Sequence, residues 1–577
     1  KTTSMGSILT LTNDLNHLKS TNEKIIVLDK IYDLKKIEDL NYKNIHVIQN
    51  KCKDKKELID TFEYCNNIYV KLLKDLTIEL NKIHGLKKNI ESWEVIIGKW
   101  LLEFIYICHK NFLLCQKALK ENQFEKIIMI EPNSYSLHVG DTEDFSWATN
   151  DSSWNLCLNS KIVEFLNSDK DKIYIKPNQK SFIRKKNKIK KVNYFIKSIF
   201  KFINKLFKFK KIVLIYSSSF KFLEEKKIEV SLGQLPRFWP RENLKINFFD
   251  KNLRKELYFK KKTDDKFLNF LRFLLPDAIP LYILESFEDI NKQMKKMNFP
   301  INPSKVFTCY GYAYDEIFKY FLSDIVEKKI PIFIGQHGNN YFTTIYSKHH
   351  RELNHPYKFI SWGVSNEKKN IFAGFNFNTC GKVIDYNPQG KLLIVTQAVG
   401  VSISPFERNI KNEKNAETVC NLINSLNAKK EFIELKLHYT HKQMFDGFYF
   451  NRYYKNLNVK KNFNDNIFKL LKKSRLVFFN YDSTGLLENL SLNIPSVCLW
   501  HDTYSHLNED YVKKYKKLVE AKILFEDFDQ LLDHINKYWD NIDQWWLSTR
   551  TQKIIKEFNN NFNINNQNYK NLTNILK

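Results

Sequence analysis

The sequence is short of glycine and proline and has no paired cysteine motif. Only 15 Gly and 13 Pro occur in 577 residues, which excludes collagen-like, glycine-linker and proline-rich architectures. The nine cysteines are odd in number and scattered, and none belongs to a C-x-x-C pair. This spacing excludes a disulfide framework and a zinc knuckle, so we expect buried thiols in a reducing, cytoplasmic setting.

Long apolar runs and common catalytic signatures are also missing. Residues 10–17 lack the apolar core of a signal peptide, so none is expected. The two most apolar stretches, 93–115 and 267–284, are interrupted by charged residues or prolines, which excludes a bilayer-spanning helix in either. The sequence contains no H-E-x-x-H, G-x-S-x-G, Walker A or G-x-G-x-x-G motif, so the common zincin, hydrolase and nucleotide-fold signatures do not apply.

Positive charge and aromatic side chains are abundant. The 92 Lys and Arg residues against 64 Asp and Glu give a net charge of +28, and aromatic residues make up 15% of the chain. A hydrophobic content of 43% predicts a folded protein with a large core. The charge has two interpretations, which are lysines on solvated faces and attraction to a polyanion such as nucleic acid or an anionic lipid surface.

The stretch 184–210 is the most unusual in composition. A basic run, RKKNKIKK (184–191), precedes apolar residues at helical spacing between Val192 and Leu206, with lysines among them. This pattern is typical of an interfacial membrane helix. A core-packing helix beside an exposed lysine-rich loop is the alternative, and the sequence favours neither.

Short apolar segments alternate with helical periodicity along most of the chain, which predicts parallel sheets of the α/β class. The strands are expected at 24–29, 45–48, 126–131, 211–216, 305–309, 330–334, 358–362, 391–397, 432–437, 476–480 and 496–499. Between the second and third of these, residues 55–123 predict a large helical layer. A turn signal at 387–390 divides the chain into an N-terminal unit, 8–387, and a C-terminal unit, 388–577.

The segment 474–500 gives the strongest local signal for a ligand site. A buried strand ends in NYDSTG (480–485), and a helix then begins. Hydroxyl groups at a helix start favour phosphate binding, here by Ser483 and Thr484. Glu488, one turn further, is placed to accept hydrogen bonds from ribose hydroxyls. Ordinary capping of the helix by Asp482 or Ser483 is the alternative.

Polar residues also follow two other expected strands. Lys436 and His438 alternate onto the same side of a strand's carboxyl end, where both reach an anionic ligand or simply form a solvated edge. The loop Gly335–Asn340 contains Gly-Gln-His-Gly. Such a loop lets backbone amides and the His337 imidazole approach a ligand closely, although a histidine there also serves to brace the loop.

Carboxylates for acid–base chemistry are expected in the polar loop after the strand 126–131. Glu131 ends that strand, and Asp151 lies close in sequence to Trp154. Aromatic neighbours desolvate a carboxylate and raise its pKa toward the working range of a base. Capping of the helix that begins near Trp154 is the alternative role for Asp151.

Taken together, these segments resemble a family of bacterial transferases encoded in surface-carbohydrate loci and related to GT-B glycosyltransferases. The resemblance is carried by ESWEVIIGKWLLEF (91–104), NDSSWN (150–155), GQLPRFW (233–239), IPLYILESF (279–287), IGQHGNNY (334–341), FISWG (359–363), SRLVFFNYDSTGLLENLSLNIPSVCLW (474–500) and DNIDQWW (540–546). It implies a GT-B-like α/β fold of two Rossmann-like domains with an N-terminal helical elaboration. The acceptor then belongs to the N-terminal domain and the donor to the C-terminal one.

The resemblance further implies a metal-independent glycosyltransferase that needs no cofactor. Its donor would be a CMP-linked ulosonic acid of the Kdo or nonulosonate type, and its acceptor a surface glycan, glycolipid or glycoprotein. The implied catalytic residues are Asp151, Glu131 and His337; the nucleotide-binding residues are Lys436, His438, Ser483, Thr484 and Glu488; and the substrate-binding residues are Gln336, Asn339, Trp154 and Asn155.

Two alternatives stay open at this point. One is a UDP- or GDP-sugar-dependent transferase, or a nucleotide-sugar epimerase or hydrolase, on the same scaffold. The other is a non-catalytic polyanion-binding protein, suggested by the charge of +28 alone. The sequence has no helix-turn-helix, RRM-like or zinc module, so no nucleic-acid partner is expected. We expect a cytoplasmic protein, at the inner face of the cytoplasmic membrane if 184–210 contacts lipid.

Overall fold

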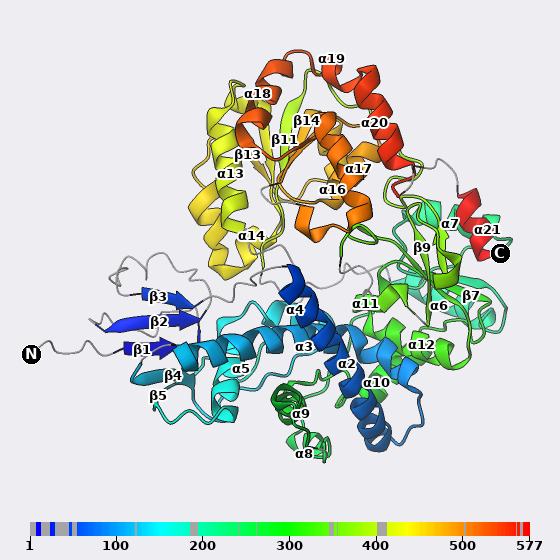
Figure 1. Ribbon diagram of the computed structural model, residues 1–577. Coiled ribbons are helices and arrows are strands. Elements are labelled where there is room, and N and C mark those ends of the chain that lie inside the picture. Colours follow the sequence, from blue (N-terminus) through cyan, green and yellow to red (C-terminus); the bar gives the residue numbers. More distant parts are fainter. Residues whose placement is uncertain are drawn as a thin grey trace, which may run out of the picture.

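Three parallel β-sheets organise the chain, each accompanied by helices (Figure 1). The computed structural model describes residues 7–12, 23–28, 45–48, 55–121, 124–184, 194–240, 242–260, 262–345, 351–354, 356–400, 412–500, 504–560, 562–565 and 569–577. The α/β class predicted from the sequence is confirmed. The region expected as a helical elaboration carries a sheet of its own, so the described residues contain one sheet more than the two Rossmann-like halves suggest.

The first unit combines a five-stranded sheet, in the order β3-β2-β1-β4-β5, with the helices α2 to α5. Its strands are β1 (Ser7–Thr10), β2 (Lys24–Leu28), β3 (Ile45–Ile48), β4 (Lys126–Ile130) and β5 (Asp171–Ile175). Its helices are α2 (Lys55–His84), α3 (Ile90–Glu121), α4 (Thr142–Ala148) and α5 (Ser152–Phe165). The predicted helical layer is therefore two long helices inserted between β3 and β4.

The second unit has a five-stranded sheet in the order β10-β9-β8-β7-β6. Its strands are β6 (Val213–Ile215), β7 (Lys305–Thr308), β8 (Ile332–Gly335), β9 (Tyr357–Ser361) and β10 (Ile371–Ala373). Its helices are α6 (Tyr194–Leu206), α7 (Phe222–Ser231), α8 (Lys251–Lys255), α9 (Lys266–Ala278), α10 (Phe287–Lys296), α11 (Gly311–Tyr314) and α12 (Glu316–Glu327).

The third unit has a six-stranded sheet in the order β13-β12-β11-β14-β15-β16. Its strands are β11 (Lys391–Val395), β12 (Ile433–Lys436), β13 (Lys460–Asn462), β14 (Ser474–Phe479), β15 (Ser496–Leu499) and β16 (Leu524–Phe525). Its α-helices are α13 (Asn412–Ser425), α14 (Thr440–Gln443), α15 (Ile467–Leu471), α16 (Thr484–Ser491), α17 (Glu509–Glu520), α18 (Phe528–Tyr538), α19 (Ile542–Trp546), α20 (Thr549–Asn559) and α21 (Lys570–Leu576). The predicted boundary at 387/388 falls between β10 and β11 and stays a prediction.

The second sheet is buried on both faces. Successive side chains of a strand point to opposite sides, and along β8 Ile332 and Ile334 pack into the core shared with the first unit, while Phe333 packs into the core shared with the third. The side chains of strand β7 alternate in the same way, with Val306 in the core shared with the first unit and Phe307 in the core shared with the third. The second unit is thus the common support of the other two.

Helix α3 packs between the first and second units. Its aromatic residues Trp93, Trp100 and Phe104 are fully buried, and Trp100 stacks on Phe104 with ring centroids 5.2 Å apart. The hydroxyl of Tyr282 donates to the carbonyl of Ile96 at 2.8 Å. A helix that is apolar nearly all round has to be enclosed, which explains why the stretch 93–115 is so hydrophobic without crossing a membrane. None of the helices in the described ranges is long and apolar enough to span a bilayer.

The chain's last helices return from the third unit to the second. The backbone of Ile564 pairs with Asn376 and Trp362, each at 2.8 Å, and the amine of Lys305 donates to the carbonyl of Ile575 at 3.1 Å. Figure 1 shows α21 beside the second sheet, away from the rest of the third unit. This crossing ties the two units together at a second place besides the loops described below.

Candidate functional site

A cavity of about 420 Å³ lies where the three units meet, and we call it the central cavity. Helix α3 lines it from the first unit with Glu94, Lys99 and Glu103. The second unit contributes residues 312–314 and 337–341, which follow β7 and β8, and the third contributes Thr484. Ligands of open α/β sheets bind outside the carboxyl ends of the strands, so this is the expected place for a site.

Two ion pairs form the α3 wall of the central cavity. Glu94 accepts a hydrogen bond from Arg351 Nε at 2.8 Å and another from the Tyr69 hydroxyl at 2.9 Å. The Lys99 amine lies 2.7 Å from Glu103. Burial lowers the pKa of Lys99, but the Glu103 carboxylate outweighs this effect and the pKa is raised overall, so the amine stays charged. These charges hold one another in place.

The opposite wall gathers tyrosines around a carboxylate. Glu352 Oε1 accepts from the Tyr312 hydroxyl at 2.7 Å and from the Tyr341 hydroxyl at 2.6 Å. Burial, followed by the Glu352 charge, raises the pKa of both tyrosines well above the usual value. Both hydroxyls therefore stay protonated and act as fixed donors.

The loop after β8 contains three of the predicted residues and is braced from within. Gln336 is buried, accepts a hydrogen bond from the backbone N–H of Trp362 at 2.9 Å and donates to the carbonyl of Gly338 at 3.0 Å. The His337 ring lies between Tyr310 and Tyr341, with centroids 4.9 and 5.6 Å away, and lines the cavity. Gln336 thus shapes the loop, while His337 faces the open space.

Asn339 connects this loop to the third unit. Its backbone N–H donates to Thr484 Oγ1 at 2.9 Å, and its side chain donates to Asp482 Oδ1 at 2.6 Å. A Cβ added to Gly338 would lie 3.3 Å from Thr484 Oγ1, so glycine suits the close approach. The predicted groups 336–339 and 483–488 are therefore brought together by direct contact.

The start of α16 uses its side chains for internal contacts. Ser483 caps the helix, since its hydroxyl accepts from the backbone N–H of Gly485 at 3.0 Å. The predicted capping alternative is thus realised, by Ser483. Asp482 is buried and also accepts from His506 Nε2 at 3.1 Å. Glu488 accepts from the Asn378 side chain at 2.8 Å, and burial raises its pKa against the opposing effects of Asn378 and Lys382.

Lys436 and His438 lie together at the carboxyl end of β12, as predicted. The Lys436 amine donates to the carbonyl of Phe463 at 2.8 Å, and burial lowers its pKa. His438 Nδ1 lies 2.9 Å from the Thr440 hydroxyl, and burial followed by the Lys436 charge lowers its pKa. Asp465 offsets part of the burial effect on Lys436, and a bound anion would further stabilise the charged form of both basic groups.

Asp151 begins α5, where its carboxylate accepts from the backbone N–H of Trp154 at 2.8 Å. The capping role left open by the sequence is therefore present. Burial, with Asp151 next, raises the pKa of Tyr135, whose hydroxyl interacts with this carboxylate. Trp154 is fully buried and donates to the carbonyl of Leu137 at 3.0 Å, and Asn155 donates to two backbone carbonyls at 2.9 Å. Both belong to the local framework of α5.

The turn between α4 and α5 faces the third unit. Trp147 stacks on Tyr439 with ring centroids 6.2 Å apart, and a Cβ added to Gly400 would lie 3.5 Å from the side-chain oxygen of Asn150. This places the turn that carries Asp151 next to the loop that carries His438. Glu131 is exposed at the end of β4, and in the described part of the chain no contact joins it to the other predicted residues.

Several residues of the central cavity were not predicted from the sequence. Glu94, Lys99 and Glu103 interrupt an apolar helical stretch, and that interruption was the available signal, since charges inside a buried helix need partners. Arg351 and Glu352 follow no strand and carry no comparable signal. Among the described residues, no group of three or more His, Cys, Asp or Glu side chains is arranged to hold a metal ion.

Comparisons with known proteins give one extensive match. The profile of the LIC12162 family transferase matches residues 7–574. No curated protein matches the sequence. Among solved structures, the chain is similar to a putative UDP-N-acetylglucosamine 2-epimerase from Listeria monocytogenes, with 14% identity, 50% of this chain and 76% of that chain covered, and a TM-score of 0.29.

Two transferase structures are similar at the same level. MurG of Acinetobacter baumannii has 11% identity and a TM-score of 0.27, and spinosyn rhamnosyltransferase SpnG has 10% identity and a TM-score of 0.25. Each match covers 51% of this chain and 77% of the other chain. TM-scores this low carry no argument about fold or activity. The family match, by contrast, spans nearly the whole sequence, and the chain therefore belongs to the LIC12162 family of transferases.

Proposed function

We propose that this chain is a glycosyltransferase that moves a sugar, a CMP-activated ulosonic acid, onto a bacterial surface glycan, glycolipid or glycoprotein. One observation carries the proposal. In a chain of a transferase family, the strand-end loops of the second and third sheets meet at the central cavity through the contacts of Asn339 with Thr484 and Asp482. A cavity between two such edges has room for a donor on one side and an acceptor on the other.

The donor phosphate is proposed to lie at the carboxyl end of β12, against Lys436 and His438. The lowered pKa of each group supports this assignment, because burial is the first cause of both shifts and a bound phosphate would stabilise the charged form of each. A CMP sugar leaves as a monophosphate, so two basic side chains supply much of the charge that its departure requires. For this reason we propose a reaction that needs neither metal nor cofactor. Thr484 and Glu488 are proposed to bind the nucleoside part of the donor.

The catalytic carboxylate is proposed to be Asp151. As a base, it takes the proton of the acceptor hydroxyl while that oxygen bonds to the anomeric carbon; the bond from carbon to phosphate oxygen breaks, and CMP leaves with the electron pair. As a nucleophile, it would first form a glycosyl ester that the acceptor then displaces. The neighbouring contact of Trp147 with Tyr439 supports a place for Asp151 facing the donor unit. The anomeric configuration of the product distinguishes the two routes.

The donor assignment is tested by ligand-induced stabilisation of the full chain. CMP and CMP sugars are expected to raise the melting temperature, and Lys436→Met is expected to abolish that rise while Lys262→Met, at an exposed position elsewhere, preserves it. Stabilisation by UDP or GDP sugars alone would overturn the CMP assignment. Product formation from the donor without an acceptor would indicate an epimerase or hydrolase instead.

The role of Asp151 is tested by Asp151→Asn. Asparagine caps a helix as well as aspartate does, so α5 should keep its start and the variant should fold. Transfer is expected to fall by at least about a hundredfold, the usual size of a general-base contribution, with nucleotide binding unchanged. Asp264→Asn, which alters an exposed carboxylate elsewhere, is the matched control. Retained transfer by Asp151→Asn would reject this role.

We also propose that the enzyme works at an anionic membrane surface through α6. The exposed residues Ile199, Phe202 and Leu206 form one stripe of that helix, with exposed fractions of 42%, 63% and 62%. On the other side, Phe200 contacts Phe238 and Asn204 donates to its carbonyl at 3.0 Å, so this side packs on the protein. An apolar stripe beside lysines suits a surface of anionic lipids. The basic run preceding α6 lies outside the described residues from position 185.

A further inference from the structure

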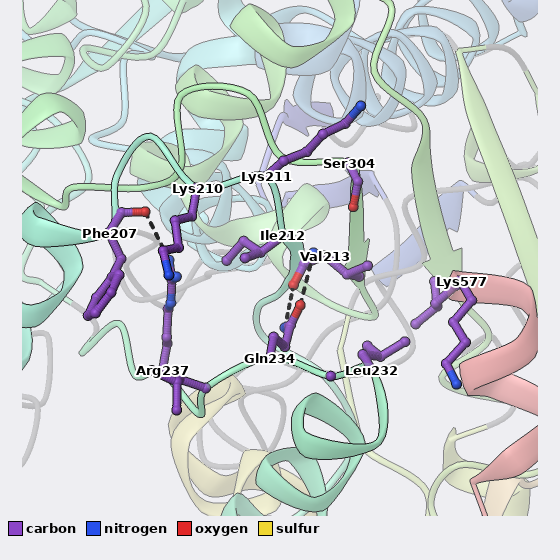
Figure 2. A pocket seen from close by; sticks show the side chains of 13 residues that line it. Phe207, Lys210, Lys211, Ile212, Val213, Leu232, Gln234, Arg237, Ser304 and Lys577 are labelled. Atoms are coloured by element: carbon purple, nitrogen blue, oxygen red, sulfur yellow. Dashed lines mark hydrogen bonds between the residues drawn. The ribbon is translucent and has the colours of Figure 1, made fainter.

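A second cavity, of about 380 Å³, lies on the second unit where α6 ends. Its wall includes Phe207, residues 210–213, residues 232–235 and Arg237. All but the first residue of the second segment belong to the motif GQLPRFW (233–239), which the proposed transfer reaction does not use. We call it the Arg237 cavity. Figure 2 shows Arg237 extending from that segment toward the carbonyl of Phe207, and Lys211 extending away from it.

The wall of the Arg237 cavity is held by side-chain to backbone hydrogen bonds. Gln234 accepts from the N–H of Val213 at 3.1 Å and donates to its carbonyl at 2.8 Å, as a neighbouring strand would do (Figure 2). Gly233 precedes it with φ of +75°, a conformation that favours glycine. The segment is therefore fixed against β6, and the position of Arg237 is set by this framework.

Arg237 is 4% exposed, yet the Nε of its guanidinium group has no hydrogen-bond partner among the described residues. Nη1 donates to the carbonyl of Phe207 over a long 3.4 Å, whereas Nε is buried with no acceptor among the described residues. Burial lowers the pKa of Arg237, and the nearby Glu229 offsets part of that effect. A buried charged donor without an acceptor is costly, which points to an acceptor supplied from outside the chain.

The charge around the cavity has one sign. Lys210 lies 5.0 Å and Arg237 5.3 Å from the centre of the same Phe207 ring. None of the lining residues that the structure describes is acidic. The Glu229 carboxylate, which acts on Arg237, is occupied by the Lys226 amine and by the backbone N–H of Arg237, both at 3.0 Å. Two cations beside a rigid wall would be stabilised by an anion between them.

We propose that the Arg237 cavity binds a phosphate monoester, held by the Arg237 guanidinium and by the Lys210 amine. An arginine edge binds two oxygens of one phosphate at once, and lysine adds a point charge. The phosphate could belong to a lipid headgroup, since the exposed α6 stripe lies beside the cavity, or to a free metabolite. The shared chemistry is the phosphate group, and the proposal is independent of the transfer reaction proposed above.

The test uses the full chain and two soluble probes, inorganic phosphate and glycerol 1-phosphate, titrated at constant ionic strength. Saturable binding is expected, weakened at least about tenfold by Arg237→Gln and less by Arg237→Lys, which keeps the charge but loses the paired contacts. Because a buried position carries a folding risk, Lys210→Gln at an exposed site is the second variant, and Lys262→Gln is its control. The proposal is overturned if no saturable binding is found, or if neither Arg237→Gln nor Lys210→Gln weakens the binding.

Vesicles distinguish the two sources of the phosphate group. Phosphatidylcholine vesicles with and without phosphatidic acid are compared for their ability to displace glycerol 1-phosphate from the full chain. Displacement only by phosphatidic acid vesicles, and lost in Lys210→Gln, supports a lipid headgroup. Binding of soluble phosphate that vesicles do not displace supports a free phosphate ligand. Nucleotide stabilisation in the Arg237 and Lys210 variants reports separately on the transferase site, so the two proposals fail independently.

Discussion

The central cavity and the Arg237 cavity are similar in size, but their charges are arranged differently. In the central cavity, each charge named above has a partner within the chain, such as Glu94 with Arg351 and Lys99 with Glu103. In the Arg237 cavity, the buried Nε has none among the described residues. Paired charges fix the shape of a site, while an unpaired charge leaves part of its interaction energy for a ligand. The comparison separates positioning groups from binding groups.

The largest effect is expected where the central cavity joins the third unit. Asp482→Asn removes a buried carboxylate that accepts from Asn339 and lies 3.1 Å from His506. The substitution should cost about 3 kcal/mol of unfolding free energy, because charge-assisted hydrogen bonds are lost in a dry environment. Urea unfolding measures the change, with Asp264→Asn as the exposed control. A change no larger than that of the control would show that this junction contributes little.

An effect of similar size, dependent on pH, is expected beneath the Arg237 cavity. Burial raises the pKa of Glu229 to about 7, despite the Lys226 charge. The folded state therefore binds the proton more tightly than the unfolded state, so stability is greatest below about pH 4.5 and decreases as the pH rises through 7. Glu229→Gln should remove this decrease, which is about 3 kcal/mol, and be the more stable protein at pH 8. Parallel pH profiles for the two proteins would contradict the assignment.

Substituting one arginine in each cavity tests whether paired and unpaired charges differ in their contribution to stability. Arg351→Gln leaves Glu94 without its cation and should cost about 1 to 2 kcal/mol, a moderate value because the pair is partly exposed. Arg237→Gln removes a cation that forms no ion pair with a carboxylate among the described residues, and it should cost less in phosphate-free buffer. Thermal or urea unfolding of both variants gives the ranking. The opposite ranking would mean that packing of the Arg237 stem outweighs the missing charge partner.

The sequence predicted the sheets better than the cavity. The strand 45–48 was located correctly from its apolar alternation and the strand 496–499 from its short apolar run, and both are local signals. The short strands β13 (Lys460–Asn462) and β16 (Leu524–Phe525) were missed because pairing with a neighbour, rather than their own composition, makes them strands.

The candidate site was predicted in part for a similar reason. The groups at 336–339 and 483–488 were found because each follows a strand, and the carboxyl ends of parallel strands are where sites form. They belong to different sheets, so the packing of the two units is what brings them into contact. Arg351 and Glu94 are 257 positions apart, and only the packing of α3 against the second unit makes them partners. Trp154 was expected to contact substrate, but the structure buries it, because an indole next to a helix start serves the core equally well.

The smallest effect on stability, and a clear effect on binding, is expected on α6, which borders the Arg237 cavity. Phe202→Glu should change the unfolding free energy by no more than about 0.5 kcal/mol, since the ring is 63% exposed and loses few contacts. Sedimentation with phosphatidylglycerol-containing vesicles should nevertheless decrease, because a carboxylate replaces an apolar anchor at an anionic surface. Phe273→Glu on α9, where the ring is 59% exposed, is the matched control. If both variants sediment like the unaltered chain, the exposed stripe of α6 is an ordinary solvated face, and a phosphate bound by Arg237 would then come from solution.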